Sequence, residues 1–145
     1  MRVAWREPAW FARPALRLRF VAELGATGTP VEVVRPPRRY RGGFAARCTV
    51  TPPGVATRQV TIVFALGSPE VPRVFVDGPD ESPHRYTGGE LCMWWPFDGP
   101  DQRWIRRDGA AALLGHIIAH LVREEWWRRT GEWPGDEAPH REENA

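Results

Sequence analysis

Apolar residues recur at steps of three and four between residues 13 and 25. One face of a helix with 3.6 residues per turn would carry Leu16, Phe20, Val21 and Leu24. Pro14 suits the first turn of such a helix, and Gly25 suits the position just past its end. The pattern predicts a short amphipathic helix over this segment.

The chain then changes to the two-residue period of β-strands. The strand-like runs are residues 31–34, 44–50, 58–66 and 73–78. Residues 51–54 and 67–69 read as turns between them. Consecutive strands with short connections predict an antiparallel meander. Cys48 shares a face of the second run with Phe44, so we expect it to be a core residue.

A second, longer helix is predicted near the C-terminus. Asp108 can cap its start, and Gly131 can end it. Its expected apolar stripe consists of Leu114, Ile117, Ile118, Leu121, Val122 and Trp126. Two favourable i,i+4 charge pairs are Glu124–Arg128 and Glu125–Arg129. A helix, a meander and a long helix together predict an α+β fold.

Residues 77–103 follow neither period, because Gly, Pro and Asp interrupt them repeatedly. Long irregular segments inside compact domains are usually functional or disordered, and the apolar content of residues 91–97 argues against disorder. Cys92 therefore lies in an ordered irregular segment, where active-site residues tend to sit. Its neighbours Leu91 and Met93 leave a second interpretation open, in which Cys92 is a buried apolar side chain.

Length and composition fit one soluble domain over residues 1–140 with a polar tail at 141–145. The chain has 145 residues, 26% of them charged, and a net charge of +2. No apolar run approaches the roughly 20 residues that cross a bilayer, and the first residues lack the apolar core of a signal peptide. We therefore expect a cytoplasmic protein that does not enter a membrane.

Two compositional biases bear on partners. All 20 basic residues are arginine, and residues 35–43 hold several of them. A solvated loop is the favoured interpretation of that run, over a nucleic-acid site, because the net charge is too small to argue for nucleic acid. Tryptophan occurs eight times. The tryptophans suit core packing, and alternatively a partner-docking surface or a homodimer interface.

Two other site patterns are present only in part. His116 and His120 have the i,i+4 spacing of a helical zinc pair, but Ile117 stands where a metalloprotease has Glu, so packing is favoured. A cysteine protease would pair Cys92 with a histidine such as His140, yet nothing local supports this. The sequence shows no cofactor or metal motif, and none is expected.

The order of elements and several short motifs resemble the ubiquitin-conjugating enzymes. Gly89-Glu90-Leu91-Cys92 is similar to the Gly-x-(Ile/Leu)-Cys of those enzymes, and His84 stands where their His-Pro-Asn begins. His84, Tyr86, Thr130-Gly131-Glu132-Trp133 and His140 resemble one bacterial branch. That branch belongs to cyclic-oligonucleotide-based anti-phage signalling systems, abbreviated CBASS. The resemblance covers residues 13–140, most specifically those after residue 83.

The resemblance implies that Cys92 forms a thioester with a protein C-terminus and passes it to an acceptor. The cargo it implies is the C-terminus of a cyclic-GMP-AMP-synthase-like (cGAS-like) nucleotidyltransferase or of a ubiquitin-like protein. His84 would support the loop, and His140 is a weaker candidate for orienting the acceptor. A separate activating enzyme is expected, because 145 residues leave no room for an adenylating domain.

The sequence also departs from the family pattern. Arg85 and Tyr86 stand where Pro and Asn are expected, and the loop to Cys92 is shorter. The oxyanion donor that Asn supplies would have to come from Tyr86, His140 or a backbone N–H. The rival hypothesis is a scaffold of the same fold with an idle thiol, which binds a partner through its tryptophan-rich C-terminal half.

Overall fold

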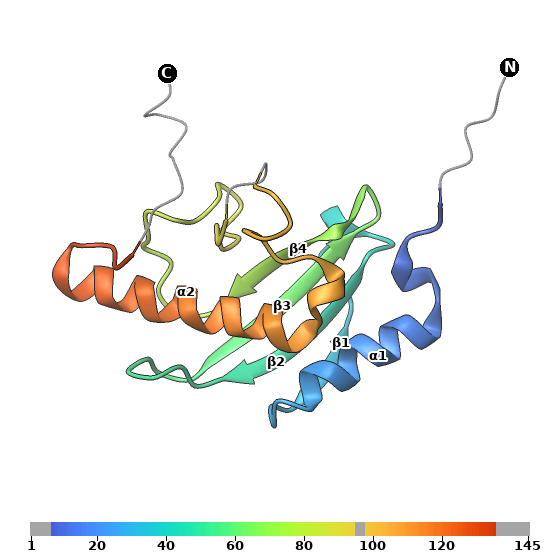
Figure 1. Cartoon of the computed structure of the whole chain (residues 1–145), viewed down its shortest axis with the longest axis horizontal. Helices are drawn as coiled ribbons and strands as arrows, with labels where there is room; N and C mark the ends of the chain where they lie inside the picture. The colour runs from blue at the N-terminus through green and yellow to red at the C-terminus, as the bar shows by residue number, and fades with distance from the viewer. Residues whose placement is uncertain (1–6, 95–97, 136–145) are drawn as a thin grey trace, which may run out of the picture.

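The computed structural model describes residues 7–94 and 98–135 (Figure 1). The main elements are α1 (Pro14–Gly25), β1 (Val31–Val34), β2 (Phe44–Val50), β3 (Arg58–Ala65), β4 (Ser68–Val76) and α2 (Ala110–Thr130). Three 3₁₀ turns are η1 (Trp10–Ala12), η2 (Arg38–Tyr40) and η3 (Arg106–Asp108). This order of elements confirms the predicted α+β fold. Within the described ranges, no helix is long and apolar enough to cross a membrane.

The four strands form one antiparallel sheet in the order β1-β2-β3-β4. Cys48 of β2 lies opposite Val60 of β3, and Ile62 of β3 lies opposite Val74 of β4. Each strand therefore pairs with its neighbour in sequence, as the meander prediction requires. β4 is an edge strand, which leaves its outer side available to the irregular segment that follows it.

Both helices cover one face of the sheet, with α2 crossing it and α1 packed beside α2 (Figure 1). The core between these layers holds residues from every main element except β1, including Phe20, Leu24, Phe44, Ile62, Val74, Leu113 and Ile117. Cys48 is 1% exposed within this core. The prediction that it is a structural residue of the sheet is confirmed.

The tryptophans divide between the core and the surface. Trp10 and Trp104 are buried, and Trp10 meets the Phe64 ring edge-on at 5.0 Å between centroids. Trp126 is 53% exposed. Core packing thus accounts for the first two, and the exposed ring of Trp126 leaves the docking interpretation open for α2.

Two boundaries differ from the prediction. β4 begins at Ser68 rather than at residue 73, although Pro69 and Pro72 lie within it. An edge strand tolerates proline where the missing N–H would face outward. At the start of α2, the Asp108 carboxylate accepts from the Ile105 N–H at 3.0 Å and so closes η3. The helix itself begins at Ala110, so Gly109 rather than Asp108 occupies its N-cap position.

The buried face of α2 also differs from the predicted stripe. His120 and Glu124 point into the protein at 2% and 0% exposure, whereas Trp126 points outward. The stripe is therefore correct as far as Leu121, which is 3% exposed, and wrong at Trp126. Two polar side chains replace apolar ones in the second half of the helix, because they pack against the segment that contains Cys92.

Candidate functional site

Residues 84–92 form a narrow hairpin on the outer side of β4. Arg85 and Leu91 form an antiparallel bridge, and the Cys92 N–H donates to the His84 carbonyl at 3.0 Å. The Leu91 N–H donates to the Val74 carbonyl at 2.9 Å, which attaches the hairpin to the edge of the sheet. The predicted irregular segment is therefore locally ordered, and the structure brings His84 and Cys92 together at its base.

The two glycines of the hairpin, Gly88 and Gly89, are favoured by different features of the local geometry. Gly89 has φ of +94°, a backbone conformation that side chains disfavour. Gly88 lies so close to Glu90 that an added Cβ would come within 2.4 Å of the Glu90 Oε1. The backbone therefore favours glycine at position 89, whereas a side chain at position 88 would displace the Glu90 carboxylate.

A buried ion pair ties one side of the hairpin to α2. Arg85 Nε donates to Glu124 Oε2 at 2.7 Å, and Arg85 Nη2 donates to Glu124 Oε1 at 2.8 Å. The side chains are 8% and 0% exposed. Arg85 also donates to the Gly89 carbonyl at 3.3 Å. Such a two-point contact fixes direction as well as distance, so Arg85 holds the hairpin in one orientation on the helix.

Glu124 is ionised in this setting. Burial acts to raise the pKa of its carboxyl, but hydrogen bonds from Arg85, His120 and Ser82 outweigh burial and lower that pKa to about 2. His120 Nε2 lies 3.5 Å from Glu124 Oε2, and Arg128 Nη2 lies 3.5 Å from Glu124 Oε1. The Glu124 carboxylate therefore holds a negative charge between the guanidinium groups of Arg85 and Arg128, with the His120 ring beside it.

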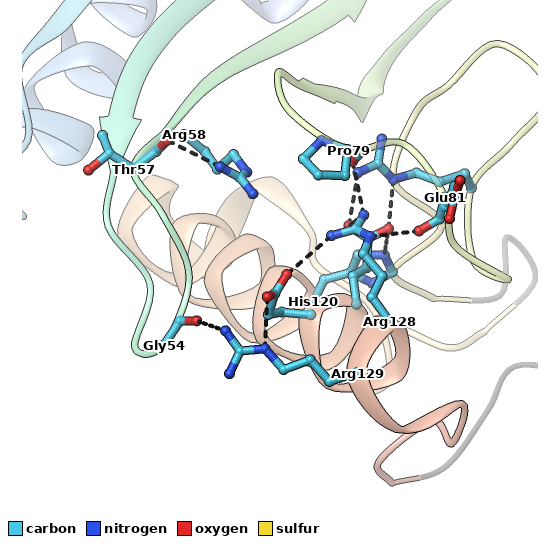
Figure 2. A network of polar contacts seen from close by, with 11 residues as sticks. Gly54, Thr57, Arg58, Pro79, Glu81, His120, Arg128 and Arg129 are labelled. Atoms are coloured by element: carbon cyan, nitrogen blue, oxygen red, sulfur yellow. Dashed lines mark hydrogen bonds and ion pairs between the residues drawn. The ribbon is translucent and has the colours of Figure 1, made fainter.

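The second half of α2 also fixes the chain that leads into the hairpin. Figure 2 shows Arg128 reaching over that chain, where it donates to the carbonyls of Pro79 and Glu81, both at 2.9 Å. Arg129 extends to the other side and contacts the Gly54 carbonyl at 3.4 Å. The loop before the hairpin is thus held by side chains of α2 rather than by a regular element of its own.

A second ion pair holds the tip of the hairpin. Glu90 Oε1 accepts from Arg39 Nη2 at 3.1 Å and from the Tyr40 hydroxyl at 3.3 Å. Arg39 and Tyr40 belong to η2, which connects β1 to β2. The hairpin is consequently restrained from two directions, by α2 on one side and by η2 on the other.

Cys92 is partly exposed at the end of this restrained segment. Burial raises the pKa of its thiol above the ordinary value, and a hydrogen bond from the Tyr86 side chain acts in the opposite direction. Cys48 is different, because burial raises its thiol pKa to about 11 and no hydrogen bond offsets this. Of the two free cysteines, Cys92 is the one with solvent access and a polar neighbour.

His84 is buried behind the hairpin. Its ring centroid lies 4.3 Å from that of Trp133, and the ring of His120 lies 5.4 Å from the same tryptophan. Gly131 ends α2 in the left-handed conformation, as predicted, and the chain then turns back so that Trp133 reaches both histidines. Through its carbonyl and its packing, His84 supports the base of the hairpin. His140 lies outside the described residues.

A small cavity is lined by both sequence neighbours of Cys92, although Cys92 itself does not line it. It has a volume of about 90 Å³, and its walls include Tyr86, Leu91, Met93, Trp94 and Trp104. Most of this lining is apolar or aromatic. A single apolar side chain of an extended peptide could occupy such a space.

The described residues contain no group of three or more His, Cys, Asp and Glu side chains placed to hold a metal ion. His116 is exposed on α2, and its ring meets that of Trp94 at 5.5 Å. His120 faces Glu124 and Trp133 instead. The two histidines with zinc-like spacing therefore have different surroundings, and each one packs against an aromatic ring.

Three residues of the site escaped the sequence analysis. Glu124 was assigned only to a helical charge pair with Arg128, and Glu90 only to a motif. Arg39 belonged to a basic run with no assigned partner. The contacts Arg85–Glu124 and Arg39–Glu90 span 39 and 51 positions of the sequence. The one local signal of these contacts was Arg85, which stands where the His-Pro-Asn pattern has proline.

Comparison with known families gives one match. The sequence matches the profile of the Type II CBASS E2 proteins over residues 34–141. Comparisons with curated proteins and with solved structures return no significant match. The matched region begins at the last residue of β1 and contains β2, β3, β4, the hairpin and α2.

Proposed function

The chain belongs to the family of Type II CBASS E2 proteins, and from this premise we propose that Cys92 carries an acyl group as a thioester. The family has an E2-like role in anti-phage CBASS. The observation that most supports the proposal is the setting of Cys92, a partly exposed thiol on a doubly restrained hairpin with a hydroxyl beside its sulfur.

The first step would be transfer of an acyl group to Cys92 from a thioester on a separate activating enzyme. The Cys92 sulfur attacks the acyl carbon, a new carbon–sulfur bond forms, and the bond to the activating enzyme's sulfur breaks. The proton of the Cys92 thiol passes to that departing thiolate. Exchange between thioesters is nearly balanced in energy, so it needs no redox partner and no metal.

The second step would release the acyl group to an acceptor. An amine attacks the thioester carbon, a carbon–nitrogen bond forms, and the Cys92 sulfur leaves with a proton from the amine. Negative charge develops first on the carbonyl oxygen and then on the sulfur. The Tyr86 side chain hydrogen-bonds to Cys92, so we assign to its hydroxyl the stabilisation that asparagine gives in other conjugating enzymes.

The other named residues have supporting roles in this proposal. His84 holds the Cys92 backbone through its carbonyl and acts as a positioning residue rather than as a base. His140 is proposed to orient the acceptor. The cargo is the C-terminus of a cGAS-like nucleotidyltransferase, or of a ubiquitin-like protein, acting in the cytoplasm. An extended C-terminal tail would place one apolar side chain in the cavity beside Met93 and Trp94.

Intact-mass spectrometry of the protein purified from its native host tests this proposal. Wild type and Cys92→Ser are compared before and after treatment with a thiol. We expect a protein-sized adduct that the thiol removes from the wild type and leaves on the serine variant, because an oxyester resists thiol exchange. The adduct mass would also identify the cargo.

The contrary outcome has a specific interpretation. If neither protein carries an adduct and Cys92→Ala retains full defence activity in cells, the thiol is idle. The molecule would then be a binding scaffold, and the exposed ring of Trp126 on α2 would be the first surface to examine for a partner or a second copy.

A further inference from the structure

The short turn η2 connects the far side of the sheet to the Cys92 hairpin. Its residues Arg39 and Tyr40 both contact the same oxygen of Glu90, at 3.1 and 3.3 Å. These two residues belong to the basic run 35–43, for which the proposed function provides no role. The other arginines of η2 and its flanks, such as Arg38, are exposed.

Aromatic rings support the contact between Arg39 and Glu90. The Arg39 guanidinium lies 4.9 Å from the centre of the Tyr40 ring and 5.4 Å from that of Phe75. The guanidinium of Arg73, in β4, also lies over the Tyr40 ring, 5.4 Å from its centre. The Glu90 side chain is 12% exposed and the Arg39 side chain is 53% exposed. The ring contacts therefore restrain Arg39 on one side, and the ion pair is shielded from solvent on the Glu90 side only.

Glu90 in turn is bonded to the residue that contacts the thiol. The Tyr86 N–H donates to the Glu90 carbonyl at 2.9 Å, so the two residues face each other across the hairpin. Gly88 packs directly on the Glu90 carboxylate and on Arg39. A displacement of Glu90 would therefore displace Tyr86, and with it the hydroxyl beside Cys92.

We propose that Arg39 and Tyr40 are positioning residues for the reaction at Cys92, acting through Glu90 and Tyr86. The inference rests on the proposed function for its relevance to acyl transfer. The primary test of the inference is the reactivity of the Cys92 thiol, which can be measured without any acyl transfer.

The test is alkylation of the full-length protein with iodoacetamide across a range of pH, followed at Cys92 by peptide mass. The variants are Arg39→Ala, Tyr40→Phe and Glu90→Gln. Arg38→Ala is the matched control, because Arg38 is an exposed arginine on the same turn. Loss of the contacts from Arg39 and Tyr40 to Glu90 should shift the midpoint of the pH profile of Cys92 alkylation to higher pH. Alkylation at pH 7 should slow by about three- to tenfold, which is the effect of one weakened hydrogen bond. Arg38→Ala should leave the profile unchanged.

A purely structural role would lower the melting temperature without moving the pH profile, so both are measured. The exchanged pair Arg39→Glu with Glu90→Arg should restore most of the wild-type profile. In a Tyr86→Phe background, Arg39→Ala should cause little further shift, because the route to the thiol is already lost. A wild-type profile in Arg39→Ala, or a full additional shift in the Tyr86→Phe background, would overturn the inference.

The two proposals fail in different ways. If the pH profile shifts as expected but no thioester forms on the wild type, the proposed function is wrong and the positioning contact remains. If the wild type forms a thioester and Arg39→Ala neither slows its formation nor moves the alkylation profile, the positioning inference alone is wrong.

Discussion

Tyr86 is the residue on which the proposed chemistry of this hairpin depends most directly. Its side chain is 42% exposed, yet its hydroxyl reaches the Cys92 sulfur. The hydrogen bond opposes the effect of burial, which otherwise favours the protonated thiol. In this balance the protonated thiol is favoured, and the sulfur becomes a reactive nucleophile when a partner removes the proton.

Replacement of Tyr86 by phenylalanine should disturb that balance. The pKa of the Cys92 thiol should rise further, and alkylation at pH 7 should slow by about three- to tenfold, since one neutral hydrogen bond is lost. The melting temperature should change little, because Tyr86 is 42% exposed and phenylalanine keeps the ring. Thiol alkylation against pH checks this, with the exposed neighbour Thr87→Ala as control. An unchanged profile would remove Tyr86 from the mechanism.

At the scale of elements, the two helices are joined by a capping contact made across the tertiary structure. The Glu23 carboxylate of α1 accepts from the Ala110 N–H at the first turn of α2, at 2.8 Å. The N-terminus of a helix has unpaired N–H groups and a partial positive charge, and a carboxylate satisfies both. The sequence analysis expected Asp108 to do this, but Asp108 closes η3 instead.

Glu23→Ala should therefore destabilise the protein by about 1 kcal/mol, the usual effect of losing a helix cap. Alanine favours helix formation, so α1 itself should be unaffected. Urea unfolding at neutral pH measures the change. Glu132→Ala is a suitable control, because Glu132 is exposed and lies beyond the end of α2. Equal stability of the two variants would show that α2 obtains its cap elsewhere.

At the scale of the whole molecule, acid stability should depend on one buried carboxylate. The pKa of Glu124 falls from 4.5 to about 2 on folding, so its contribution is present above pH 4.5 and is lost as the pH falls toward 2. A shift of this size corresponds to a loss on the order of 3 kcal/mol across that range. Because the Arg85 guanidinium keeps its charge in acid, protonation of Glu124 leaves Arg85 without a counterion.

Urea unfolding between pH 5 and 2 in wild type and Glu124→Gln tests this expectation. The glutamine variant should be less stable at neutral pH, because Arg85 loses its charged partner, and its stability should fall less steeply in acid. Glu132→Gln serves as the exposed control. Parallel acid profiles for wild type and Glu124→Gln would contradict the assignment. If Glu124→Gln does not fold, Glu124→Asp retains the charge and permits the same measurement.

Local patterns predicted the elements better than they predicted the site. The alternation around Cys48 located the second strand, and Gly131 marked the end of α2, because both signals lie within a few residues. The burial of Glu124 could not be predicted in this way, since its pairing with Arg128 is equally compatible with a surface position. The partners of Arg85 and Arg39 are distant in sequence, so only the folded chain identifies them.

The pairing of Arg85 with Glu124 also constrains how this protein can change over evolutionary time. Loss of either residue alone would leave a buried charge beside the hairpin, so an isolated substitution should be selected against. We expect descendants to lose both charges in close succession, or neither. A lineage that acquires proline at position 85 should carry an uncharged residue at position 124, with a rigid backbone replacing the ion pair as the support of the hairpin.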